Sequence, residues 1–199
     1  MSRKESLRCC AVGLPGQIRT PGSLRISDDS DEFCGEFAVT ADRAPHFRCE
    51  VRQANGSRMK SLWFRPYTLA DWQSAIPNTL VEHLDIRLVE IGPDYLRGTM
   101  PVDRRTHQPQ GLLHGGASVA LAETLGSIAA NMVIDGSTHL AVGQEINANH
   151  LRGVRSGLVT GTARALYLGR TSQVWGIEIL NADGQLVCVS RITMAIIAR

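Results

Sequence analysis

The chain has 199 residues, of which 43% are hydrophobic and 20% are charged, an ordinary balance for a globular protein. The formal net charge of +2 offers no strong attraction to nucleic acid, and no apolar run approaches the roughly 20 residues of a membrane span. The five cysteines have neither disulfide-framework nor zinc-site spacing, so we expect a cytoplasmic protein.

Residues 1–58 differ from the rest of the chain. They hold four of the five cysteines, none of the three tryptophans and no sustained helical or strand periodicity. We therefore predict that this segment is poorly ordered. Arginine outnumbers lysine 19 to 2, which is typical of GC-rich coding, where upstream reading frames stay open. One hypothesis is that the natural chain starts at Met59, and the alternative is a genuine disordered tail.

Residues 59–199 carry the signals of one domain. Thr68 and Asp71 have the spacing of a capping box, which favours the start of a short helix. In chain order we next expect a helical turn and then two strands around a Gly-Pro-Asp turn: residues 79–83, 84–91 and 95–102.

A polar loop, residues 103–113, leads into the longest predicted helix, residues 114–133. This helix is apolar nearly all round, so we expect it to be buried. Four long strands joined by glycine-containing turns are expected after it: residues 139–151, 158–168, 172–181 and 185–197. One central helix with five or six mostly antiparallel strands is an α+β layer architecture.

The start of the long helix carries the residues with chemical potential. Gly115 and Gly116 leave backbone N–H groups open to a ligand, at a position where the helix dipole favours negative charge. Glu123 is a lone carboxylate on an apolar helix, and it is costly to bury without a task or a partner. The segment thus offers an oxyanion site together with a base or nucleophile.

Helix geometry indicates that two copies of the chain build one site. His114 and Glu123 are nine residues apart, so they point to roughly opposite sides and lie about 12–14 Å apart along the axis. One chain cannot easily bring both to a single reacting group, whereas a twofold dimer does so twice. Glu123 and Ser127 are one turn apart and share a face.

These residue types suit acyl transfer. We expect the Gly115 N–H to stabilise the oxyanion, with Gln108 and His114 beside it. Glu123 would attack the carbonyl or activate water, Ser127 would orient the water or the carboxylate, and partial burial should raise the pKa of Glu123. Simpler interpretations stay open: an arginine partner for Glu123, tight packing at the glycines, and plain structural roles for His114 and Ser127.

Other catalytic motifs are missing. The chain has no GxSxG nucleophile elbow, no HExxH zinc motif and no GxGxxG dinucleotide loop. We therefore expect no metal and no cofactor. Cys188 lies in a predicted strand and is expected in the core.

Several short motifs occur together between residues 68 and 197. They are Met100-Pro-Val-Asp103, Gln108-Pro109, Gly111-Leu-Leu-His-Gly-Gly-Ala-Ser118, Leu121-Ala-Glu123, Gly126-Ser127, Glu145-Ile-Asn-Ala-Asn-His150 and Ser172-Gln-Val-Trp175. This combination resembles the hot-dog-fold acyl-CoA thioesterases. Within that family it is most similar to the branches that act on aromatic acyl thioesters in menaquinone and enterobactin synthesis. One departure is Gln110, which stands where those branches carry an aromatic residue.

The resemblance implies a long helix wrapped by a curved antiparallel sheet, and a homotetramer built as a dimer of dimers. It implies hydrolysis of acyl-CoA to free acid and coenzyme A. Gln108, His114 and Gly115 would serve from one subunit, and Glu123 and Ser127 from the other. The coenzyme and the rest of the substrate would be bound by residues of strand ends and turns: His150, Arg152, Arg155, Gly169, Arg170, Thr171 and Ser172.

Two other functions stay open. A hot-dog hydratase or dehydratase would act on the same thioesters, but its usual His-led, Pro-rich loop is missing from this sequence. A non-enzymatic acyl-CoA-binding module would bind without releasing the thiol, and the lone carboxylate Glu123 argues against it.

Overall fold

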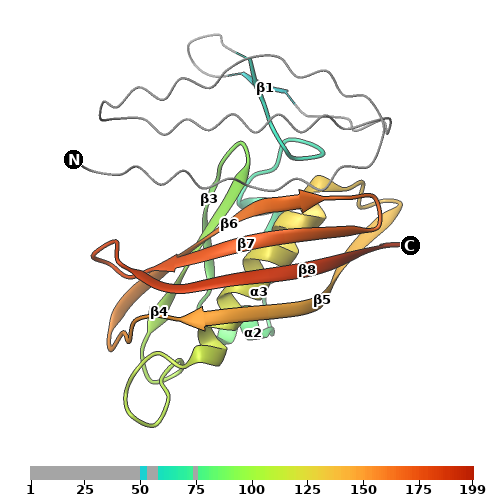
Figure 1. The fold of residues 1–199 in the computed structure, drawn as a ribbon. Coiled ribbons are helices and arrows are strands. Elements are labelled where there is room, and N and C mark those ends of the chain that lie inside the picture. Colours follow the sequence, from blue (N-terminus) through green and yellow to red (C-terminus); the bar gives the residue numbers. More distant parts are fainter. Residues whose placement is uncertain (1–49, 53–57, 74–75) are drawn as a thin grey trace, which may run out of the picture. The chain divides into compact units, whose positions relative to one another are not determined.

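The computed structural model describes residues 50–52, 58–73 and 76–199 (Figure 1). Most of the segment 1–58 lies outside these residues, so its predicted disorder and the start at Met59 stay predictions. Near the end of that segment, strand β1 (Glu50–Arg52) pairs antiparallel with strand β2 (Arg58–Lys60), which extends beyond it.

A six-stranded antiparallel sheet curves around one long helix, α3 (Gly115–Val133), as Figure 1 shows. The strand order is β3-β4-β6-β7-β8-β5. The strands are β3 (Arg87–Ile91), β4 (Tyr95–Val102), β5 (His139–His150), β6 (Gly157–Leu168), β7 (Ser172–Leu180) and β8 (Leu186–Ala198). The predicted fold class is confirmed. No described helix is long and apolar enough to cross a bilayer.

The first strand of the sheet begins later than predicted. The sequence pattern placed its start at Leu84, whereas β3 starts at Arg87. Leu84 instead caps helix α2 (Leu80–His83), and Asp85 has a φ of 52°, in the left-handed region. The chain therefore turns before it can extend. The bounds predicted for α3 and the other five strands agree with the structure within one residue.

Two short helices precede the sheet. Helix α1 (Ala70–Gln73) follows Thr68, whose backbone N–H donates to the Asp71 carboxylate at 2.7 Å, as expected for one half of a capping box. Helix α2 starts after Thr79, whose hydroxyl accepts from the Glu82 N–H at 3.4 Å. Both helix predictions are confirmed, and these caps fix the segment that covers one flank of α3.

Glycines let α3 lie close to the sheet. Gly98 of β4 is paired with Gly161 of β6, and a Cβ on either would come within 2.8 Å of a Leu125 methyl group. A Cβ on Gly126 would lie 2.5 Å from the Ile192 side chain. Leu125 therefore fills a slot that only a glycine pair leaves open, which fixes the register of the helix against the sheet.

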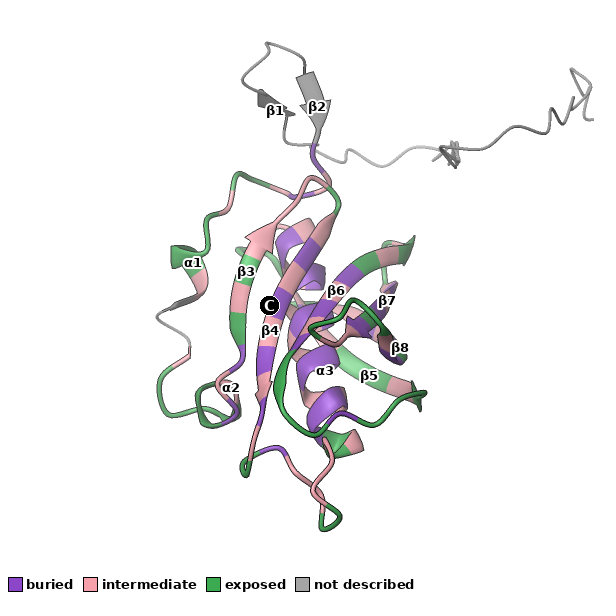
Figure 2. Ribbon diagram, turned by 90° about the vertical axis from the view of Figure 1, so that its left-hand side faces the viewer, coloured by how far each residue is buried: buried purple, intermediate pink, exposed green. Residues whose placement is uncertain are grey.

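Helix α3 is buried on one face, not all round as predicted (Figure 2). The buried residues are Ala117, Ser118, Leu121, Ala122, Leu125, Gly126, Ala129, Ala130 and Met132. On the opposite face Val119, Glu123, Ser127 and Ile128 are only half-buried, because the curved sheet covers one side of the helix. An apolar but partly uncovered face remains.

An aromatic stack joins the segment before α1 to strand β7. Trp63 and Trp175 stack with ring centroids 6.3 Å apart and ring planes 7° apart, and both are buried. The Trp63 indole N–H donates to the Gly92 carbonyl at 2.6 Å. This stack fastens the segment before α1 to the sheet. Cys188 is fully buried, as predicted.

Candidate functional site

The loop between β4 and α3 is held by one buried threonine. The Thr106 hydroxyl donates to the Pro101 carbonyl at 3.0 Å and accepts from the Asp103 N–H at 3.0 Å. Its carbonyl accepts from the His114 N–H at 2.7 Å, and Leu113 N–H donates to the Val154 carbonyl at 2.7 Å. The residues at the start of α3 are therefore fixed before any ligand arrives.

His114 and Gly115 present two donors at the start of α3. His114 is the N-cap, and its Nδ1 accepts from the Gly116 N–H at 2.8 Å. A neutral His114 ring therefore carries its proton on Nε2, which is free to donate to a substrate. The Gly115 N–H has no hydrogen-bond partner among residues 58–73 and 76–199. It lies at the positive end of the helix dipole, as an oxyanion donor should.

The Gln108 amide is also oriented. Its Oε1 accepts from the Gln110 N–H at 2.7 Å, and its backbone N–H donates to the Leu112 carbonyl at 2.8 Å. With the amide oxygen occupied, the NH2 group is the part of the side chain that remains to donate to a carbonyl. The structure thus places Gln108, His114 and Gly115 on one short, fixed segment.

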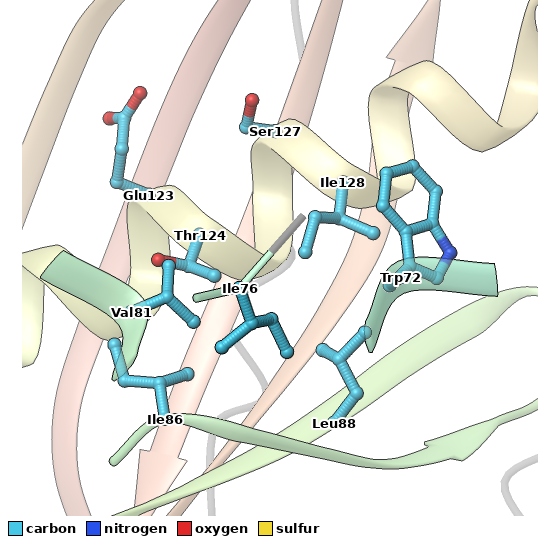
Figure 3. A pocket seen from close by; sticks show the side chains of 9 residues that line it. All are labelled: Trp72, Ile76, Val81, Ile86, Leu88, Glu123, Thr124, Ser127 and Ile128. Carbon is cyan, nitrogen blue, oxygen red and sulfur yellow. The ribbon is translucent and has the colours of Figure 1, made fainter. Parts of the chain in front are cut away.

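Glu123 and Ser127 lie together at the mouth of a cavity of about 350 Å³. Figure 3 shows both side chains pointing to the same side of α3, as their spacing of one turn predicts. The rest of the lining is mostly apolar and lies below them: Trp72, Ile76, Val81, Ile86, Leu88, Thr124 and Ile128. The cavity is large enough for a small acyl group.

The Glu123 carboxylate has no counter-charge in the described structure. Burial is the only cause acting on it, and burial raises the pKa of its carboxyl above the ordinary value, as predicted. Among the described residues, no ion pair involves it, so the arginine partner considered above is not found. A desolvated carboxylate beside an apolar cavity is suited to act as a nucleophile or general base.

Within one protomer the two halves of the site stay apart. Gly115 begins α3 and Glu123 lies eight residues further on, so a regular helix separates them by about 12 Å along its axis. The structure therefore places Glu123 and Ser127 on one face of α3, and places Gln108 on the same loop-to-helix segment as His114 and Gly115, but it does not bring these two groups together. A site shared between two copies stays a prediction.

The arginines predicted to bind coenzyme A lie in two turns, at opposite ends of β6. Arg152 and Arg155 precede β6, where Arg155 contacts the Gln110 carbonyl at 3.4 Å and so lies beside the oxyanion loop. Arg170 follows β6 in one turn with Gly169 and Thr171, and Ser172 begins β7. A strand of 12 residues spans roughly 40 Å, so these two groups cannot hold the same phosphate within one protomer.

His150, at the end of β5, lies against the oxyanion glycine. A Cβ on Gly115 would be 2.7 Å from the His150 Nε2, so the imidazole packs on the bare glycine. The tight-packing interpretation is therefore confirmed for Gly115, while its role as an oxyanion donor stays a prediction. No cluster of three or more metal-ligating side chains occurs in the described ranges, and the need for a metal stays untested.

Sequence reasoning missed the apolar cavity. Its walls come from α1, α2, β3 and α3, and neither Trp72 nor Leu88 carried any local sign of lining a site. The available signal was a pair of large apolar side chains, Trp72 and Val81, on two short capped helices, because such side chains need an apolar surface elsewhere in the protein to pack against. In the described structure that surface is the half-buried face of α3.

The sequence was compared with known proteins and solved structures. Residues 110–188 match the thioesterase superfamily. The 1,4-dihydroxy-2-naphthoyl-CoA hydrolase of Escherichia coli (strain K12) is 50% identical over 136 residues, which are 68% of this chain and 99% of that protein. The proofreading thioesterase EntH of Cronobacter turicensis is 50% identical over 136 residues, 68% of this chain and 98% of that protein.

Solved structures of thioesterases are also similar to this chain. A crystal structure of a mutant thioesterase from Pseudomonas aeruginosa is 48% identical, has a TM-score of 0.69, and matches over 70% of this chain and 100% of that one. A thioesterase from Haemophilus influenzae is 48% identical with a TM-score of 0.67, over 69% of this chain and 95% of that one. Identity of this degree over nearly the whole length of each relative shows common descent as well as a common fold.

Proposed function

The chain belongs to the thioesterase superfamily and is a hot-dog-fold hydrolase of thioesters, and from this premise we propose that it hydrolyses aromatic acyl-CoA to free acid and coenzyme A. One observation carries the proposal: Glu123, partly desolvated and without a counter-charge among the described residues, lies at the mouth of an apolar cavity. The cavity volume and the indole of Trp72 in its wall suit a ring better than a polar acyl group. The E. coli relative is named for a naphthoyl thioester, which is of the same class.

The position of Glu123 at the mouth of the cavity allows two routes of thioester hydrolysis. With the acyl group in the cavity, the thioester carbonyl lies at its mouth, within reach of Glu123. Either the carboxylate attacks the carbonyl carbon and expels the thiolate, leaving an anhydride that water cleaves, or Glu123 takes a proton from water as the water attacks. Each route consumes one thioester and one water, and releases one acid and one thiol. Ser127 would orient the water.

Heavy-oxygen water tests the covalent route. In a single turnover the label enters the Glu123 side chain only if water has cleaved an anhydride at the Glu123 carbonyl. The base route puts label only in the released acid, as does an anhydride that water cleaves at the substrate acyl carbon, so label in Glu123 is the decisive result.

A second protomer would complete the site. The oxyanion of the intermediate needs a donor, and the free Gly115 N–H of the same helix is too far from Glu123 to supply it. Strand β5 is an edge strand of the sheet, and the half-buried face of α3 carries Val119 and Ile128. A twofold dimer along this side would cover that face and bring Gly115 of each copy to Glu123 of the other.

Mixing two inactive variants tests this arrangement. We expect Glu123→Gln and Gly115→Pro each to be nearly inactive, while their co-expressed mixture regains about a quarter of the wild-type activity. Half of the randomly formed dimers are mixed, and each mixed dimer has one intact site and one doubly damaged site. Thiol release by the purified mixture measures the recovery. A mixture as inactive as its components would mean that the site is not shared.

The outer face of the sheet supports a dimer of dimers. Leu166 of β6 is 64% exposed and Val189 of β8 is 36% exposed, and both line a hollow on that face. Arg164, Glu178 and Arg191 lie around the hollow, so the face carries apolar groups and charges of both signs. Such a surface can match a second copy of itself.

Arg170 is proposed to bind a phosphate of coenzyme A. Arg170→Glu should raise KM for acyl-CoA by about tenfold and change kcat much less, since the contact is made in both the ground state and the transition state. The effect should shrink as salt is added. Arg87→Glu, an equal charge change at an exposed position of β3, is the control. A loss in kcat with unchanged KM would remove Arg170 from the binding site.

A panel of acyl-CoA substrates tests the proposed function itself. Thiol release should be fastest with hydroxybenzoyl or naphthoyl thioesters and slower with acetyl or long-chain ones. Hydration of an enoyl-CoA without thiol release would indicate the hydratase alternative. Tight binding of every thioester with no reaction would indicate a binding module.

A further inference from the structure

Strand β5 contains one extra residue in its middle. Its register with β8 shifts between Gly143 and Glu145, which leaves Gln144 as a β-bulge. Side chains alternate along a strand, so positions seven residues apart normally face opposite sides of the sheet. One inserted residue reverses the alternation. As a result, Gly143 and His150 both face α3.

The bulge places a bare backbone position against the candidate catalytic carboxylate. A Cβ on Gly143 would lie 2.6 Å from Oε1 of Glu123, 3.6 Å from its Cδ and 3.9 Å from its Oε2. These distances are too short for a methyl group beside the carboxylate as it lies. No described residue hydrogen-bonds the Glu123 side chain, so contact with this backbone is what limits its position on the β5 side.

We propose that Gly143 is a positioning residue for Glu123: its missing side chain lets the carboxylate lie against β5 at the mouth of the cavity. The inference rests on the proposed function of Glu123. It also gives the bulge at Gln144 a role, because the bulge allows a single strand to support Glu123 with Gly143 and to cover Gly115 with His150. Bulges are frequent near active sites because they re-aim residues in this way.

A side chain at residue 143 should lower the catalytic rate and leave the stability of the fold nearly unchanged. Gly143 does not have a positive φ, so its backbone accepts an alanine without strain. The atom that a methyl group would meet is the end of a flexible side chain, and Gly143 is exposed in the protomer. Glu123 can therefore move aside cheaply, and it would move by roughly 1 Å, a displacement that can cost about a hundredfold in rate.

The test is Gly143→Ala. We expect kcat for an aromatic acyl-CoA to fall by roughly ten- to a hundredfold, with KM and the melting temperature little changed. Gly136→Ala is the matched control, because a Cβ at Gly136 meets nothing within 4 Å. A Gly143→Ala enzyme with wild-type kcat would overturn the inference, and so would one whose KM rises while kcat holds.

A second background separates positioning from a general structural effect. In Glu123→Asp the carboxylate ends one methylene short of Gly143, so adding Gly143→Ala should cost at most about threefold more. An equal loss in both backgrounds would mean that the methyl group acts elsewhere. The proposed function is tested separately: if Glu123→Gln keeps normal turnover, the function proposed for Glu123 fails. If that variant is inactive but Gly143→Ala is normal, only the positioning role fails.

Discussion

Glu123→Gln should lower kcat by at least about a thousandfold while the protein stays folded, the largest effect expected for any single substitution in this chain. The amide keeps the size and shape of the side chain but can neither attack a carbonyl nor accept a proton from water. Wild-type activity should fall as the pH drops through the raised pKa of Glu123, because only the ionised form reacts. That acidic limb should disappear from the residual activity of the variant.

The same substitution should not lower the stability of the folded protein, although it abolishes activity. Burial raises the pKa of Glu123, so the folded protein holds the proton more tightly than the unfolded chain does, and ionisation at neutral pH costs stability. The neutral amide removes this cost, so the melting temperature of Glu123→Gln should equal or exceed that of the wild type. Asp183→Asn, at an exposed position of the turn between β7 and β8, is the control for both measurements. Near-normal turnover in Glu123→Gln would end the mechanism.

The second large effect is expected at Gly115. Substitution by proline or by alanine adds a Cβ close to the His150 ring, but only the alanine variant keeps the backbone N–H. Gly115→Pro removes the donor, whereas Gly115→Ala keeps it. Proline is favoured at the first position of a helix, and the preceding His114 already has φ −69° and ψ 133°, the conformation that a following proline requires. The proline variant should therefore fold.

The comparison isolates the oxyanion donor. We expect kcat of Gly115→Pro to be about 10²–10³-fold below that of Gly115→Ala, since this is the usual cost of losing one such donor. Both variants place a Cβ against the His150 ring, so the effect of that contact is common to the two rates. Circular dichroism and melting curves confirm folding. Equal rates in the two variants would show that the Gly115 N–H does not contact the oxyanion.

The parts of the site that could be predicted are those that one helix determines. Ser127 follows Glu123 by one turn, and Gly115 follows the N-cap His114 directly, so helix geometry alone relates them. The strands could be predicted because burial alternates along them, as in β4. Beyond this, the resemblance identified the fold, and the structure confirms it.

The parts that could not be predicted depend on tertiary contacts. Trp72 and Leu88 meet at the cavity only because α1 and β3 pack on the same flank of α3. Gly143 looks like any strand glycine until the bulge beside it turns it toward Glu123.

The positions of the three tryptophans allow ligand entry into the cavity to be followed by tryptophan fluorescence. Trp63 and Trp175 are buried against each other, whereas Trp72 lines the cavity. An aromatic ring that enters the cavity would change the emission of this one indole. In a chain whose other two tryptophans are replaced by phenylalanine, fluorescence would follow the arrival and departure of the acyl group in real time, separately from the release of the thiol.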